Sequence, residues 1–260
     1  PRRHEVAYTG SIDIHFEDPV MLRTAFDGSR RRRIYVFRHG DVSYVDDQGN
    51  RVADSTIVPL TAWGREQATR TSEALANIPF DRAVVSSFPR SVETASLILQ
   101  GRNLDIEQDP AFVEFQGDST ARNAITDLND LAYAFRNAAV PGARYVGGDS
   151  FEEVNRRVVT ALERVLTEPE WETLALVAHG GINRLVLGWA FGTGLASFSS
   201  IDQHTCCFNI IDVDVHPETN EVVRKTVRAM NVTSYDVAKE GNHLLSLEQI
   251  ATRMKKKALA

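Results

Sequence analysis

The fold and the expected chemistry of this chain are decided by residues 34–40, which read IYVFRHG. Four apolar residues in a row are typical of a strand that is buried on both faces of a parallel sheet. Such sheets bind their ligands at the carboxyl ends of their strands, and Arg38 and His39 lie at that end here. An Arg-His-Gly tripeptide is common by chance, so its meaning depends on the residues at the ends of the other strands.

Alternating strand and helix patterns continue along the chain after this first strand. Ser150 and Glu153 form a capping box at the start of one expected helix. Strands are predicted at 82–86, 104–108 and 173–178, helices at 61–76, 89–100, 119–138, 150–166 and 181–191, and an antiparallel hairpin at 206–215 and 222–230. This order predicts an α/β fold, a three-layer αβα sandwich with a mostly parallel central sheet.

The pattern divides the chain into three parts. Residues 1–33 are expected to be an N-terminal arm, with an added half-buried strand at 12–16. Residues 34–235 form the main domain, with a cap-like insertion at about 115–147, and 236–260 form a C-terminal helical tail. The basic runs 30–33 and 255–257 are interpreted as solvated flanks, with a patch for an anionic partner as the alternative.

Composition excludes several classes of protein. The 260 residues carry a net charge of −6, which argues against a nucleic-acid-binding surface, and no apolar run is long enough to span a membrane. Cys206 and Cys207 are adjacent, which suits neither a disulfide nor a zinc site. We therefore expect a cytoplasmic protein with buried structural thiols, no metal and no cofactor.

Charged residues follow all three buried strands of the predicted sheet. Arg38 and His39 follow the first, Arg90 comes shortly after the second, and His179 follows the third. Guanidinium forks match the oxygens of a tetrahedral dianion, and a neutral imidazole can attack phosphorus to form a phosphohistidine. The surrounding cations can stabilise the transferring group without a metal. This constellation predicts phosphoryl transfer.

With these residues in place, the sequence resembles the histidine phosphatase superfamily, in its phosphoglycerate mutase-like branch. The likeness covers roughly residues 34–235 with the order of the motifs intact. The matching stretches are 38–40 (RHG), 60–68 (LTAWGREQA), 86–95 (SSFPRSVETA), 112–117 (FVEFQG), 148–158 (GDSFEEVNRRV) and 177–181 (VAHGG).

The resemblance assigns roles to the residues around the phosphate. It implies that His39 is the nucleophile phosphorylated during turnover and that Arg38, Arg90 and His179 bind the phosphoryl group. A histidine beside a phosphate dianion has its charged form favoured, so we expect His179 to be protonated in the complex. His39 must instead present a free lone pair, with its other ring nitrogen donating to a backbone carbonyl.

The resemblance also implies a proton donor. Glu114 would protonate the leaving alkoxide and then act as base for the attacking water, with Asp118 as the next candidate. The alternative is that Glu114 is a surface carboxylate between two aromatic residues.

One departure from the family pattern favours a phosphatase over a mutase. Mutases of this family have an asparagine that touches phosphate where this chain has Val45. Ser43 and Tyr44 are expected to reach the substrate, an expectation that rests only on their position in the sequence. A mutase, and a non-catalytic scaffold that kept the fold, stay as alternatives.

The substrate lies beyond what the motifs indicate. We expect a small phosphorylated metabolite, with a phosphoprotein as the alternative, and specificity in the covering segments 41–58 and 115–147. The strand expected at 206–215 offers either a homodimer interface or a covered sheet edge.

Overall fold

A six-stranded mixed sheet organises the chain in a computed structural model, which describes residues 27–45, 52–123, 125, 127–168, 170–241 and 243–258. The strand order is β3-β2-β4-β1-β5-β6, in which β1 to β4 are parallel and β5 runs antiparallel to both β1 and β6. The strands are β1 (Arg30–Arg38), β2 (Arg82–Val85), β3 (Ile106–Gln108), β4 (Thr173–Ala178), β5 (Phe208–Val215) and β6 (Val222–Val232). The mostly parallel sheet and its antiparallel hairpin are confirmed.

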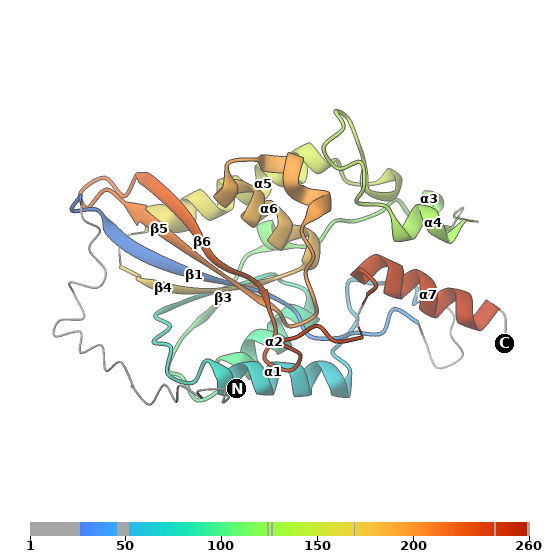
Figure 1. The fold of residues 1–260 in the computed structure, drawn as a ribbon, viewed down its shortest axis with the longest axis horizontal. Coiled ribbons are helices and arrows are strands. Elements are labelled where there is room, and N and C mark those ends of the chain that lie inside the picture. Colours follow the sequence, from blue (N-terminus) through green and yellow to red (C-terminus); the bar gives the residue numbers. More distant parts are fainter. Residues whose placement is uncertain are drawn as a thin grey trace, which may run out of the picture.

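Helices cover both faces of this sheet. The helices α1 (Ala62–Ala74) and α2 (Pro89–Ile98) lie on one face, and α5 (Phe151–Thr167) and α6 (Gly180–Phe191) lie on the other (Figure 1). Thr61 Oγ1 caps α1 by accepting from Gly64 N at 3.0 Å, and Ser150 caps α5 as the sequence indicates. Each face has its own apolar core, so the predicted three-layer sandwich is confirmed.

The prediction of one continuous helix over 119–138 is wrong. The segment forms two short helices, α3 (Ser119–Asn123) and α4 (Leu128–Ala132). Asp127 accepts a hydrogen bond from Asn129 N at 2.8 Å and so caps a new helix instead of continuing the first. Short 3₁₀ turns η2 (Pro110–Phe112), η3 (Tyr145–Gly147) and η4 (Gly194–Ser200) complete the connections.

The C-terminal segment forms α7 (Ser246–Ala258), which packs against α4 beyond the carboxyl ends of the strands (Figure 1). Ala251 is buried in this contact. The helix therefore lies at the end of the sheet where the charged residues were predicted to gather. In the described ranges, no helix combines the length and the apolar character that crossing a membrane requires.

The interpretation of residues 30–33 as a solvated flank is wrong. These arginines belong to β1, and the antiparallel register sets Arg31 and Arg33 opposite Asp214 and Asp212. Arg31 Nε donates to Asp214 at 2.7 Å, Arg33 Nε donates to Asp212 at 2.6 Å, and Arg32 is fully buried. Arg32 donates to the backbone oxygen of Leu166, so its charge is hydrogen-bonded inside the fold. The strand predicted at 12–16 and the side chains of 255–257 lie outside the described residues.

Candidate active site

The ends of parallel strands bring the predicted phosphate-binding residues together. Arg38 ends β1 and His39 follows it, His179 follows β4, and Arg90 lies in the first turn of α2 after β2. These side chains are nearly inaccessible, at 8% exposure for Arg38, 2% for His39, 3% for Arg90 and 0% for His179. Arg38, His39, Arg90 and Glu114 line a cavity of about 100 Å³, and the His179 ring lies 5.2 Å from that of His39.

The hydrogen bonding of His39 leaves one ring nitrogen free to react. Its Nδ1 lies 2.7 Å from the backbone oxygen of Gly40. Because a carbonyl oxygen only accepts, Nδ1 carries the proton and Nε2 keeps its lone pair. Burial, followed by the charges of Arg90 and Arg38, lowers the pKa of His39 well below its ordinary value, so the imidazole is neutral.

Three buried nitrogen atoms around His39 have no hydrogen-bond partner among the described residues. They are Arg38 Nε, Arg90 Nε and His179 Nδ1. The other arms of the two guanidinium groups are anchored, since Arg38 Nη1 donates to Gln203 O at 2.6 Å and Arg90 Nη1 donates to Ser55 O at 2.9 Å. Buried donors without partners are costly. Arg38 and Arg90 line the cavity, where an anion would offer acceptors to their guanidinium groups.

His179 is held as a neutral ring that can still donate one hydrogen bond. Burial lowers its pKa well below the ordinary value, and the charge of Arg90 adds to this effect. Its Nε2 lies 2.7 Å from Ser86 Oγ, and a hydroxyl that donates to Nε2 leaves the proton on Nδ1. The described surroundings of His179 thus favour the neutral ring, whereas the sequence predicted a charged ring in the complex with a dianion.

Glu114 lies at the N-terminus of α6. Its two carboxylate oxygens accept from Gly181 N at 3.0 Å and from Phe115 N at 3.1 Å. A Cβ atom on Gly181 would overlap Glu114 Oε1, so glycine is required at this close approach. Asp118 instead caps α3 by accepting from Ala121 N at 2.8 Å, and it does not line the cavity.

Only one of the two predicted substrate contacts reaches the cavity. Tyr44 lines it, with its ring 6.0 Å from Arg90 Cζ. Ser43 does not line it, because its hydroxyl donates to the backbone oxygen of Val45 at 2.7 Å. The structure therefore brings Tyr44 to the site and leaves Ser43 outside.

The turn after His39 is fixed by the start of α1. A Cβ atom on Gly40 would lie 2.5 Å from Gly64 O, so the two backbones meet without side chains between them. Gln67 Oε1 accepts from Asp41 N at 2.8 Å, which holds the turn from the other side. The stretch 60–68 thus acts on the geometry of His39 and not on the ligand.

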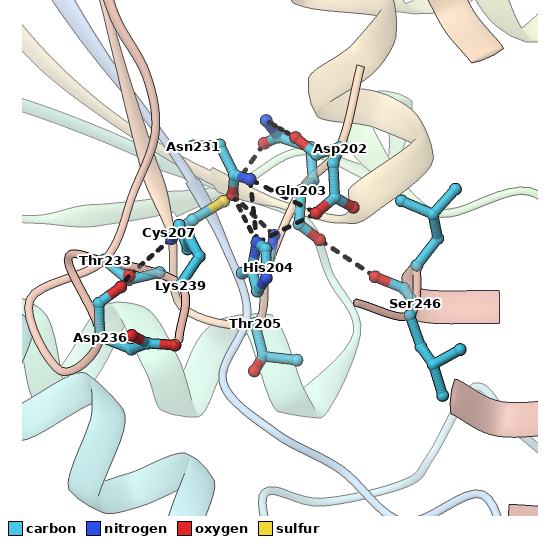
Figure 2. A network of polar contacts seen from close by, with 12 residues as sticks. Asp202, Gln203, His204, Thr205, Cys207, Asn231, Thr233, Asp236, Lys239 and Ser246 are labelled. Atoms are coloured by element: carbon cyan, nitrogen blue, oxygen red, sulfur yellow. Dashed lines mark hydrogen bonds and ion pairs between the residues drawn. The ribbon is translucent and has the colours of Figure 1, made fainter. Parts of the chain in front are cut away.

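Arg184 and Ser246 are among the polar residues that line the cavity and that sequence reasoning missed. Arg184 is a charged residue inside an apolar helix, and that signal could have drawn attention to it. Ser246 begins α7, and its hydroxyl donates to Gln203 O at 3.1 Å (Figure 2). The same hydroxyl accepts from Arg38 Nη1 at 2.6 Å. Nothing in the sequence connects Ser246 to Arg38, which lies 208 residues earlier.

The two cysteines are structural, as predicted. Both are buried, and burial raises the pKa of each thiol to about 12. Neither thiol is a reactive nucleophile at neutral pH.

Comparison with known proteins decides the family. The family model for the histidine phosphatase superfamily (branch 1) matches residues 34–226. The chain belongs to this superfamily. The matched range contains His39, His179, Arg38, Arg90 and Glu114.

Similar proteins and solved structures support membership of the same superfamily. The chain is 26% identical over 188 residues to the probable phosphoglycerate mutase GpmB of Proteus mirabilis, covering 71% of this chain and 86% of that protein. Among solved structures, the alpha-ribazole phosphatase of Shigella flexneri is 23% identical, with a TM-score of 0.60 over 76% of this chain and 96% of that one. A mycobacterial glucosyl-3-phosphoglycerate phosphatase is 23% identical, with a TM-score of 0.62 over 78% and 99% of the two chains. At this identity the structures establish the shared fold.

Proposed function

We propose that the chain is a phosphatase that hydrolyses a phosphomonoester through a covalent phosphohistidine on His39. The observation that carries this proposal is the set of unpartnered donors, Arg38 Nε, Arg90 Nε and His179 Nδ1, around the free Nε2 of a neutral His39. The set matches what a phosphoryl group needs, which is a nucleophile in front and fixed donors around its equatorial oxygens.

The first step transfers the phosphoryl group to the enzyme. His39 Nε2 attacks phosphorus, the bond from phosphorus to the ester oxygen breaks, and Glu114 gives its proton to the leaving oxygen. The ring gains positive charge while Nδ1 keeps its proton, and the backbone oxygen of Gly40 stabilises that charge. The cavity has room for several water molecules in addition to these side chains.

The second step returns His39 to its starting form. Water attacks the phosphohistidine, Glu114 accepts a proton from that water, and the bond between phosphorus and Nε2 breaks. Inorganic phosphate leaves with the oxygen and one proton of the water, and Glu114 holds the other proton for the next cycle.

A mutase is the second candidate, and it is supported by the names of relatives such as the Proteus mirabilis protein. A mutase keeps its phosphohistidine until it passes the group to an acceptor. Val45, at the position of the phosphate-touching asparagine of mutases, favours hydrolysis. Following labelled phosphate from the phosphoenzyme separates the two, since transfer to water alone rejects the mutase.

The proposal is tested by the release of phosphate from p-nitrophenyl phosphate in the presence of EDTA, for the wild type and for His39→Ala. We expect metal-independent release by the wild type and loss of release in the variant. Equal rates would remove His39 from the mechanism, and no wild-type activity on a broad panel of phosphomonoesters would favour a non-catalytic scaffold. Cytoplasmic location and a homodimer stay predictions.

A further inference from the structure

The cavity has an apolar end beyond the residues that surround the phosphate position. This end is built by three separate parts of the chain: the loop after β1, the covering segment 115–147, and α7. Its apolar and aromatic lining residues are Val52, Phe115, Leu131, Phe135, Tyr145, Val146, Leu247, Ile250 and Met254. A bound ester would therefore hold its phosphate among arginines and its alcohol portion among apolar side chains.

One face of α7 supplies a wall of this apolar end. Leu247, Ile250 and Met254 are spaced three and then four residues apart, which places them along one side of a helix. Ser246 fixes the start of that helix through its hydrogen bond with Gln203 (Figure 2) and a second one with Arg38. The wall is thus tied directly to a phosphate-binding arginine.

The cationic residues in the described part of the cavity lining either surround the phosphate position or have partners within the protein. Arg38 and Arg90 surround the phosphate position. Arg184 donates from Nε to Ile201 O at 2.6 Å and from Nη1 to Gly180 O at 3.2 Å, and its Cζ lies 5.0 Å from the ring centre of Phe135. Arg184 Nη2 also lies 3.9 Å from Asp202 Oδ1. Among the described lining residues, a carboxylate on the alcohol portion would therefore meet only a cation that already has these partners, and an unpaired buried carboxylate is strongly disfavoured.

We infer that the site takes phosphomonoesters of uncharged, apolar alcohols, and that the Leu247, Ile250 and Met254 face of α7 is the subsite that recognises them. This inference rests on the proposed phosphatase function. It argues against a phosphorylated small carboxylic acid as the preferred substrate. Burial of apolar surface on α7 would supply the selectivity, and the phosphate end would be the same for every ester.

A series of primary alkyl phosphates tests the substrate class. Methyl, butyl and hexyl phosphate release alkoxides of similar basicity, so the chemical step is nearly constant while apolar length changes. We expect kcat/KM to rise about twofold to fourfold for each added methylene that is buried. The matched acid, 5-carboxypentyl phosphate, should fall at least about tenfold below hexyl phosphate. A flat series, or a preference for the acid, would overturn the inference.

Variants of α7 test the location of the subsite. We expect Ile250→Ala and Met254→Ala each to reduce the ratio of kcat/KM for hexyl over methyl phosphate by about fivefold. The matched control is Thr252→Ala, on the same helix but outside this cavity, which should keep the wild-type ratio. An unchanged ratio in both α7 variants would reject the subsite while the phosphatase function stands. If the wild type hydrolyses p-nitrophenyl phosphate but no ester in the series, the inference fails while the phosphatase function stands. If it hydrolyses neither, the proposed function itself fails.

Discussion

The two ends of the cavity are built in different ways. The phosphate end is formed by strand ends and helix starts of the central sheet, and its four key side chains are almost fully buried. The apolar end is formed by short helices, turns and α7, which lie far apart in the sequence, and most of its lining side chains are only partly buried. The first arrangement fixes the positions of the reacting atoms, and the second is joined to it through the hydrogen bond between Arg38 and Ser246. This difference suits a constant chemistry with a variable substrate.

The largest effect should come from the proposed nucleophile at the phosphate end. His39→Asn removes Nε2 while keeping a polar side chain of similar reach, and we expect kcat to fall about 10⁴-fold or more for every ester tested. Steady-state rates with methyl and hexyl phosphate measure this. A variant that retained most of its activity on either ester would contradict the claim that the phosphate end supplies the nucleophile for every ester.

Removal of the proposed proton donor should depend on the leaving group. For Glu114→Gln we expect about a 10³-fold loss in kcat for alkyl phosphates, whose alkoxides need a proton. With p-nitrophenyl phosphate the loss should stay below about tenfold, because that leaving group is stable as an anion. Asp118→Asn is the control, since its carboxylate caps α3 outside the cavity. Equal losses for both ester types would argue that Glu114 only positions α6.

The loss of a phosphate-binding donor should be smaller and independent of the alcohol portion. For Arg90→Gln we expect kcat/KM to fall about 10²-fold to 10³-fold, by the same factor for methyl and hexyl phosphate. Arg70→Gln is a matched control, because Arg70 is an exposed arginine that pairs with Glu66 on α1. A loss that differed strongly between the two esters would show that Arg90 also acts at the apolar end.

Acid should destabilise the fold through the buried histidines of the phosphate end. Their pKa values lie well below the ordinary 6.5, so below that pH the unfolded chain binds more protons than the folded chain. Between pH 7.5 and 5.5 each imidazole should therefore lower the free energy of unfolding by about 1 kcal/mol. Urea denaturation measures this, and His39→Asn should reduce the pH-dependent loss by about that amount. An identical loss in wild type and variant contradicts the neutral form of His39.

The phosphate end was predictable from sequence for a physical reason. Arg38, His39 and His179 lie at or directly after the ends of buried strands, and parallel strands end at the same edge of a sheet, so local patterns were sufficient to gather them. Glu114 needed the family resemblance, because it follows no strand directly and meets α6 only through Gly181.

The apolar end was not predictable in the same way. The spacing of Leu247, Ile250 and Met254 indicates an apolar helix face, but a spacing does not say what that face covers. The interpretation of 30–33 as a solvated flank failed for a related reason. The sequence shows four charges, whereas the ion pairs of Arg31 and Arg33 depend on Asp214 and Asp212 in β5, which only the register of the strands brings opposite.

The central claim is the covalent intermediate on His39, and trapping it tests that claim most directly. Wild-type protein mixed with excess ester is quenched in alkali, where phosphohistidine is stable, and its peptides are analysed by mass spectrometry. We predict one phosphoryl group on the peptide containing His39, lost on mild acid treatment and absent from His39→Asn. Hydrolysis that proceeds with no phosphorylated protein, or with the phosphoryl group on another residue, would contradict the proposed mechanism.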